Sequence, residues 1–430
     1  MSKKRNDRES PADTDLEQSA SGAAEWSFNP LSSEFAKDPY AAYEILRNRK
    51  QLSYFADFDI WLVSRFADVT DIIMNRRMVR TPESFLSAEQ VAAQKRRENF
   101  HDMPYHSRFV QFSLLDSEGE VHFRLRRQVF SMLTAVSIEG LRAYVQKFVD
   151  EQIDALMDRK EIDFVEDFAA GIPGHVIGRI LGVPEEDCPR LRAWSENIVQ
   201  YFDIDRSDER KELAERTTEE FYEYLIALKT KRSKTPQDDL ISRLIKAENA
   251  GKIDGDEFIS TCMLILMAGH GSTIDAMGSG MHVLLRFPEQ MLRLRRDPLL
   301  ISTAVQEMFR YESPLPFMHR YTTEDIELNG QTFSKGTRFG VLYGSANRDP
   351  EQFEDPDRFD ITREPNKHLA FSRGAHFCMG NHLSRLDMEI VFTTLLKRFS
   401  KIRLVGDEPE YRRGLSVRGP KSLQIELVPA

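Results

Sequence analysis

The chain has 430 residues and a formal net charge of −10, with 41% hydrophobic and 30% charged residues. This balance is typical of a globular protein with a large buried core, and the acidic charge argues against a nucleic-acid-binding protein. The longest apolar run, CMLILMA from Cys262, is too short to span a membrane, and no secretory-type apolar segment follows the basic N-terminus. We therefore expect a cytoplasmic protein without a membrane span.

The predicted elements begin after a polar N-terminal segment. Residues 1–25 contain few large apolar side chains, so we expect a disordered tail, followed by a single domain over residues 26–430. Short strands are predicted at residues 60–64 and in a hairpin around Asn329-Gly330. Apolar residues at helical spacing predict helices over 40–49, 141–157, 165–181, 190–201 and 210–232. The chain is therefore predicted to be mainly α with a few small β-sheets.

The longest predicted helix covers residues 256–286 and would be roughly 46 Å long at 1.5 Å per residue. A helix of this length must cross the whole molecule. Its middle contains Gly269, Gly271, Gly278 and Gly280, each costing about 1 kcal/mol relative to alanine. We interpret these glycines as making room for a bulky group against the helix backbone.

Three cysteines are too few for a disulfide framework, and Cys188 and Cys262 are predicted to be small buried hydrophobic residues. Cys378 differs because Gly374 and Gly380 flank it and a helical pattern follows. Backbone N–H groups of a glycine-containing loop and the start of a helix both stabilise a thiolate, as a metal ligand requires. A glycine turn that contains a buried cysteine by chance is the alternative.

The segment around Cys378 resembles the cysteine loop of the cytochrome P450 family. The family pattern F-x-x-G-x-[HR]-x-C-x-G is matched at Phe371, Gly374, His376, Cys378 and Gly380. The resemblance implies the cytochrome P450 fold with a long central helix over haem b, iron protoporphyrin IX. It makes Cys378 the iron ligand, with Phe371 shielding the sulfur and His376 contacting a haem propionate. A thiolate ligand favours cleavage of the O–O bond.

Two further stretches resemble family segments that stabilise the fold. EMFRYESP contains Glu307 and Arg310, one helical turn apart, and Arg358 in the following ANRDPEQFEDPDRF segment is predicted to complete a Glu–Arg–Arg network. By the same resemblance, His122, Arg126 and Arg320 are expected to bind the haem propionates. Cations are needed there because two carboxylates must be neutralised at the edge of an apolar pocket.

The central helix departs from the family pattern [AG]-G-x-[DE]-T. Ala268 and Gly269 match and are expected to lie against the haem, but Gly271 replaces the acid and Ser272 the threonine. Ser272 is predicted to be the catalytic hydroxyl, with Thr273 as a second candidate turned by about 100° around the helix. His270, at the variable position, is predicted to be satisfied within the fold.

Three interpretations of this departure stay open. Ser272 with ordered water supports ordinary monooxygenation, the substrate supplies its own polar group, or the enzyme uses peroxide or a relay-free reaction. A haem-binding protein without turnover is a further alternative.

The predicted substrate is a small apolar molecule, contacted by Phe112, Ile265, Phe317 and Met318. No reductase segment follows the cysteine loop, so the resemblance implies electrons from a ferredoxin and its NAD(P)H-dependent ferredoxin reductase. Arginines near the haem-side motifs, Arg124, Arg127 and Arg373, are expected to contact this acidic partner. We expect a monomer.

Overall fold

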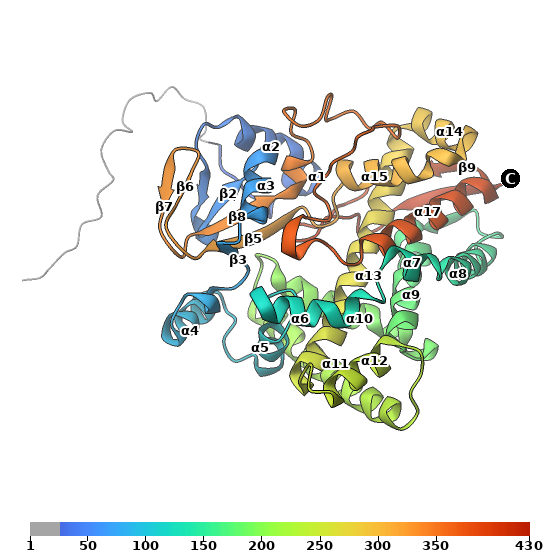
Figure 1. Cartoon of the computed structure of the whole chain (residues 1–430). Helices are drawn as coiled ribbons and strands as arrows, with labels where there is room; N and C mark the ends of the chain where they lie inside the picture. Colours follow the sequence, from blue (N-terminus) through green and yellow to red (C-terminus); the bar gives the residue numbers. More distant parts are fainter. Residues whose placement is uncertain (1–25) are drawn as a thin grey trace, which may run out of the picture.

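The computed structural model describes residues 26–430, and the predicted disordered tail of residues 1–25 lies outside the described part. Helices form most of the molecule, and a smaller β-rich region lies at one side of it (Figure 1). The helices are α1 (Ser33–Lys37), α2 (Pro39–Asn48), α3 (Phe66–Met74), α4 (Ala88–Arg97), α5 (Pro104–Gln111), α6 (Gly119–Phe130), α7 (Ala135–Glu139), α8 (Arg142–Asp154), α9 (Gly171–Leu181), α10 (Cys188–Val199), α11 (Asp208–Lys234), α12 (Leu240–Asn249), α13 (Gly255–Arg286), α14 (Pro288–Arg296), α15 (Ile301–Tyr311), α16 (Tyr343–Ala346) and α17 (Asn381–Arg398).

The strands are short and form three small sheets. They are β1 (Ser53–Phe55), β2 (Ile60–Val63), β3 (Met78–Val79), β4 (Glu161–Asp163), β5 (Phe317–Thr322), β6 (Ile326–Leu328), β7 (Gln331–Phe333), β8 (Arg338–Leu342), β9 (Phe399–Leu404) and β10 (Gln424–Pro429). The largest sheet has the order β1-β2-β8-β5-β3, with β2 and β8 parallel. Asn329 and Gly330 take positive φ values of 51° and 72° between β6 and β7, as the hairpin prediction requires. The predicted fold class is confirmed.

Helix α13 is the predicted central helix and crosses the molecule (Figure 1). A capping box fixes its start, because the Asp254 carboxylate accepts from the backbone N–H of Glu257 and the Glu257 carboxylate accepts from that of Asp254. Most of its side chains are buried, in contrast to a surface helix. Within residues 26–430, no helix is long and apolar enough to cross a membrane.

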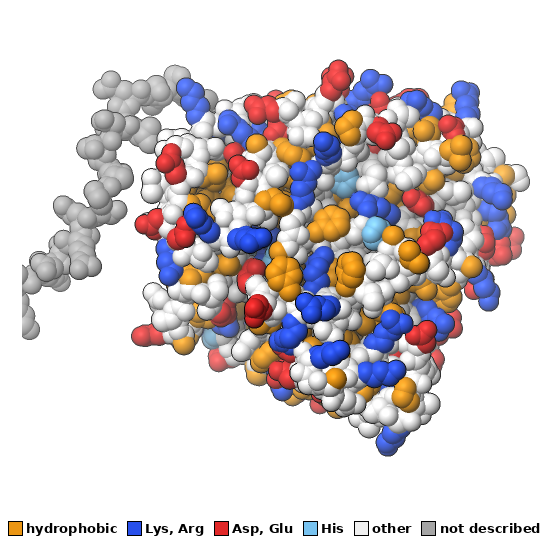
Figure 2. Space-filling model, in the orientation of Figure 1, with side chains coloured by type: hydrophobic (Ala, Val, Ile, Leu, Met, Phe, Trp, Pro, Cys, Tyr) orange, Lys and Arg blue, Asp and Glu red, His pale blue; other side chains and the backbone are white. Residues whose placement is uncertain are grey.

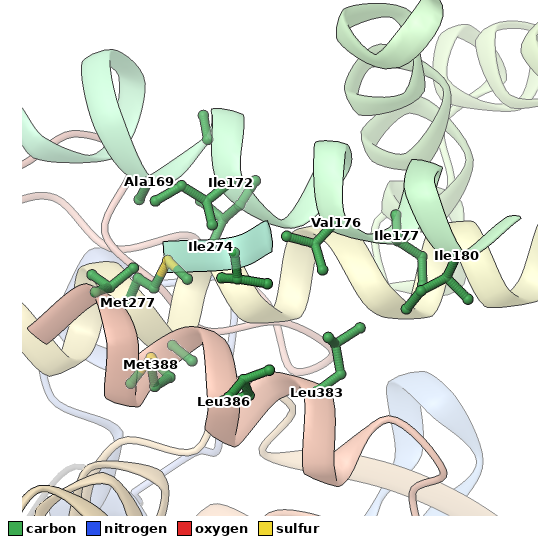
Figure 3. Close-up of a cluster of buried hydrophobic side chains, with 14 of the residues drawn as sticks. Ala169, Ile172, Val176, Ile177, Ile180, Ile274, Met277, Leu383, Leu386 and Met388 are labelled. Atoms are coloured by element: carbon green, nitrogen blue, oxygen red, sulfur yellow. The ribbon is translucent and has the colours of Figure 1, made fainter. Parts of the chain in front are cut away.

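Aliphatic side chains pack α9 and α17 around α13, as Figure 3 shows. Val176 and Ile180 of α9 lie on one side of the central helix, Ile274 lies on α13 itself, and Leu383 and Leu386 extend from α17. Each of these side chains is at most 4% exposed. The apolar contacts therefore fix α17, which follows the cysteine loop, relative to α13.

Close packing against protein side chains explains three of the four central-helix glycines. The interpretation that all four make room for a bulky group was therefore wrong. A Cβ atom would come within 3.1 Å or less of a neighbouring side chain at Gly269, Gly278 and Gly280. At Gly271 it would meet no atom within 4 Å. Of these four glycines, only Gly271 therefore has open space beside it.

This difference predicts opposite effects of alanine at two positions. Gly278→Ala should lower the free energy of unfolding, because overpacking costs about 1–3 kcal/mol. The helix preference of alanine recovers only about 1 kcal/mol of that. Gly271→Ala should instead raise the free energy of unfolding by up to about 1 kcal/mol. Urea unfolding followed by circular dichroism measures both, and an equal stabilisation would contradict the packing explanation.

The Glu307–Arg310 pair is fully buried, with the Arg310 Nε 2.7 Å from the Glu307 carboxylate. Arg310 also donates to the carbonyls of residues 347, 356 and 358. The predicted third member was wrong: the Arg358 side chain is 62% exposed, and only its carbonyl joins the network. Arg363 takes this place, with its Nε 3.2 Å from Glu307, because the turn after Arg358 directs the later arginine inward.

Candidate active site

The cysteine loop combines a tight turn with a helix start. Gly374 has a φ of 73°, and a 3-10 turn over Gly374–His376 leads to Cys378. The backbone N–H of Cys378 donates to the carbonyl of Phe371 over 3.0 Å. Phe371 is buried and packs against Phe309 with 4.7 Å between ring centroids. Helix α17 begins three residues after Cys378, so the sulfur lies at its N-terminal end.

The electrostatics around Cys378 oppose the cost of burying a thiolate. Burial raises the pKa of the Cys378 thiol, while the Gly380 N–H, the Arg126 and Arg385 guanidinium groups and the Asn381 N–H lower it. Arg385 is not among the residues predicted from the sequence. Its place one turn after Asn381, whose amide oxygen accepts from it over 2.6 Å, is the signal that would have found it.

The three predicted propionate-binding residues differ in how far protein groups satisfy them. His122 is bonded through both ring nitrogens, to the carbonyls of Leu114 and Ala375, and Arg126 donates to the carbonyl of Phe377 over 2.7 Å. Arg320 is 3% exposed, and the one hydrogen bond of its guanidinium within the described chain goes to the carbonyl of the residue before it. A buried guanidinium with so few partners fits an anionic group that the protein itself does not supply.

His376 lies beside both His122 and Glu118. Its Nε2 is 3.2 Å from the Glu118 carboxylate, and its ring centroid is 4.3 Å from that of His122. Burial lowers the pKa of His376 to about 4, although Glu118 acts in the opposite direction. Its contact with a propionate stays a prediction.

One face of α13 is accessible in the middle of an otherwise buried helix. Ala268 is exposed, and Leu264, Gly271 and Ser272, which are four residues before and three and four after it, are partly exposed. This spacing defines a single helix face. The Ser272 Oγ donates to the Ala268 carbonyl over 3.0 Å, so its oxygen remains an acceptor on the accessible face.

The side chains of Thr273 and His270, also on α13, do not lie on this accessible face. Thr273 is buried, and its hydroxyl lies 3.2 Å from that of Ser384 on α17. His270 is 1% exposed and packs against Gly174 of α9, which confirms that it is held within the fold. The Ala170 backbone approaches the His270 ring, but no hydrogen bond of good geometry forms within the described residues, so the expected satisfaction is incomplete. Burial lowers its pKa to about 4 and keeps it neutral.

Two predicted substrate contacts lie outside this accessible region. Phe317 packs in a separate core cluster with Ile60 because it is on the face of β5 opposite to Met318 and Arg320. Ile265 is buried in the main core, one position from Leu264 and therefore turned by about 100° around α13. Neither side chain therefore faces the accessible strip of α13, and both substrate contacts stay predictions. Phe112 and Met318 remain partly exposed.

The residues present fit a haem. Cys378 would supply a thiolate, the buried Arg320 with His122 and Arg126 would neutralise propionates, and the accessible strip at Ala268 and Gly271 leaves room for a flat group. Such a cofactor supplies redox chemistry with dioxygen that protein side chains cannot perform.

The comparisons with known proteins agree with this chemistry. The family model "Cytochrome P450" matches residues 188–427. The biotin biosynthesis cytochrome P450 of Bacillus subtilis is 35% identical, covering 92% of this chain and 97% of that protein. The 6-deoxyerythronolide B hydroxylase of Saccharopolyspora erythraea is 31% identical, covering 92% of this chain and 98% of that protein. The crystal structure of P450BioI with hexadec-9Z-enoic acid ligated acyl carrier protein superposes with a TM-score of 0.85 at 34% identity, covering 92% of this chain and 99% of that chain.

The family model, the relatives and the solved structure all indicate the same family. The chain is a member of the cytochrome P450 family of haem-thiolate monooxygenases, which bind haem b.

Proposed function

We propose that this enzyme inserts one oxygen atom from dioxygen into an apolar small molecule, with Cys378 as the iron ligand and Ser272 as the hydroxyl that assists proton delivery. The accessible strip of α13 is the observation that carries this proposal, because Ser272 lies on it and Thr273 does not. Gly271 offers no acid, so ordered water or a polar group of the substrate takes that role. Oxidation with ¹⁸O₂ tests the reaction: one labelled atom should appear in the product.

The proposed substrate has an extended apolar body. Leu264 and Ala268 present aliphatic surface on the accessible strip, and the relatives named above include one bound to a fatty acyl group on a carrier protein. Long acyl chains and polyketide-like molecules fit this lining. A difference-spectrum screen of such compounds would identify ligands of the haem site.

The proposed electron donors are a ferredoxin and its NAD(P)H-dependent reductase. On the α6 side of the cysteine loop, Phe123, Phe130 and Phe377 are exposed, and Arg127 lies among them. On the face drawn in Figure 2, Lys and Arg side chains lie beside hydrophobic ones around the middle of the molecule, where α6 runs in Figure 1. A basic surface with apolar anchors suits a small acidic partner.

The arginines predicted for this contact differ in availability. Arg124 forms a bidentate pair with Glu257 at the start of α13 and is already occupied. Arg373 donates to the carbonyl of Lys367 over 2.9 Å, and its guanidinium lies over Phe66. Arg127 is the exposed candidate. The identity of the partner, the monomeric state and the cytoplasmic location stay predictions.

Ser272→Ala is expected to uncouple the enzyme. A positioned proton donor contributes about 10²–10⁴-fold in rate, and we expect the lower end because Gly271 has already removed the acid. NAD(P)H would still be consumed, while product per NAD(P)H falls and hydrogen peroxide rises. Unchanged turnover and coupling would instead favour the peroxide-driven or relay-free reaction, or a haem protein without turnover if the wild type also forms no product.

Gly271→Asp distinguishes the two remaining explanations of the missing acid. The glycine has free space beside it, so the new side chain can be accommodated. Better coupling with an arbitrary apolar substrate would show that the relay is merely weak. Lost binding of the natural substrate would show that the glycine makes room for a polar substrate group.

A further inference from the structure

Three charged residues meet where α4, the segment between α10 and α11, and strand β8 come together. Glu98 follows α4, Arg206 precedes α11, and Arg338 begins β8. The Glu98 carboxylate lies 3.1 Å from Nη1 of Arg206 and 3.4 Å from Nη1 of Arg338. The three side chains are 17%, 14% and 12% exposed, respectively. One carboxylate therefore bridges two largely buried guanidinium groups.

The two arginines have more hydrogen-bonding capacity than Glu98 uses. A guanidinium carries five N–H donors, yet each of these two guanidinium groups makes a single hydrogen bond within residues 26–430, to this carboxylate. The Nε atoms of both are buried without a partner in the described chain. Burial lowers the pKa of Arg206, Glu98 raises it, and the neighbouring Arg338 lowers it. The cluster therefore has one positive charge in excess and donors that no described group satisfies.

Nearby groups do not supply a second anion. Arg206 lies 4.4 Å above the ring of Phe100, and Arg338 lies 5.6 Å from that of Tyr321. Burial, helped by the guanidinium groups around it, lowers the pKa of His319 well below its usual value. The two aspartates beside Arg206 in the chain are engaged by other groups: Asp205 lies 3.4 Å from Arg210, and Asp208 accepts from the Asn99 amide over 2.9 Å. Aromatic rings and a neutral imidazole thus surround the two cations.

Strand β5 lies between this cluster and Arg320, the residue predicted to bind a haem propionate. Tyr321 pairs directly with Arg338 across the β5–β8 ladder, and His319 lies on the same face of β5. Arg320 lies between them in sequence and points to the opposite face, where it serves the predicted propionate contact. The cluster therefore lies across strand β5 from Arg320, on the side where Gln94 of α4 donates to the Tyr321 hydroxyl, and α4 is peripheral in the molecule (Figure 1).

We propose that Arg206 and Arg338 bind a carboxylate at one end of the apolar substrate, and that Glu98 occupies this place in the substrate-free enzyme. A planar carboxylate can accept two parallel hydrogen bonds from a guanidinium, which would use the donors left free here. The inference rests on the proposed function, since it names the substrate class as a long-chain carboxylic acid. Arg206 and Arg338 would be specificity-determining residues.

The test compares saturated fatty acids of ten to eighteen carbons with their methyl esters, by titrating the spin-state change of the haem-loaded enzyme. The wild type should bind the best acid at least about tenfold more tightly than its ester. Arg206→Gln and Arg338→Gln should each weaken acid binding by about 10- to 100-fold and leave ester binding unchanged. Arg97→Gln is the matched control, because Arg97 lies at the end of α4 and is 63% exposed.

Glu98→Gln separates recognition from a structural role. If Glu98 occupies the carboxylate site, its neutral variant should bind the acid more tightly, whereas a merely structural latch would weaken the binding of acid and ester alike. Equal losses for acid and ester in the arginine variants, or no acid preference in the wild type, would overturn the inference. The carbon monoxide spectrum and the oxidation of the ester test the proposed monooxygenase activity. A failure of that activity can therefore be distinguished from a failure of the carboxylate inference.

Discussion

Cys378→Ala is expected to abolish the long-wavelength absorption band of the reduced carbon monoxide complex. That band is typical of a thiolate-ligated haem, and alanine offers no ligand atom. The loss should be complete, because the described residues near this loop contain no second thiol: Cys188 and Cys262 are buried elsewhere in the core. Spectra of purified protein, reduced and saturated with carbon monoxide, measure the effect.

Cys262→Ala is the matched control. Cys262 is fully buried on α13, and burial raises its pKa far above the usual range, so it is an inert packing residue. This variant should keep the band with only a modest loss of stability. Retention of the band in Cys378→Ala, or its loss in Cys262→Ala, would show that the ligand has been assigned to the wrong residue.

Arg310→Met should destabilise the protein severely. The Glu307 carboxylate would lose its principal partner while fully buried, and breaking a buried ion pair in this way costs about 3–5 kcal/mol. Native domains are stable by only about 5–15 kcal/mol, so this loss removes a large share of the free energy of unfolding and should shift the unfolding midpoint markedly. The midpoint of urea unfolding, followed by circular dichroism, measures the loss.

Two companion variants test the membership of this network. Arg358→Ala removes a side chain that is 62% exposed and should change the free energy of unfolding by less than about 0.5 kcal/mol. Arg363→Ala removes a side chain that contacts Glu307 and is only 13% exposed, so it should cost clearly more. A larger loss of stability in Arg358→Ala than in Arg363→Ala would support Arg358 as the third member of the network, as predicted from the sequence.

The elements with strong local signals could be predicted from the sequence. The central helix was predicted at 256–286 and is observed at Gly255–Arg286, because a continuous apolar pattern and a capping box both mark it. The Asn329-Gly330 hairpin follows from local turn chemistry. The sheet order could not be predicted, because β2 and β8 are far apart in the chain and no local pattern specifies their pairing.

The candidate site shows the same division. The cysteine motif identified the loop because many fixed positions fall within a few residues. Phe317 and Ile265 turn away from the accessible strip because strand register and helix phase direct them so. Arg358 was misassigned because the turn after it brings Arg363, five residues later, to Glu307. The Arg206–Glu98–Arg338 cluster joins three distant segments and left no sequence pattern to find.

The buried Arg320 has a consequence for how the enzyme is assembled. Its guanidinium lies in a nearly dry environment with one hydrogen bond to a neighbouring carbonyl, an arrangement that costs free energy while no anion is present. A group that binds the native state and neutralises this charge shifts the folding equilibrium by mass action. Helix α6, helix α13, strand β5 and the cysteine loop each contribute one side of the site, so the cofactor joins segments from distant parts of the chain. Haem supply is therefore expected to raise the folded fraction of the chain as well as its activity.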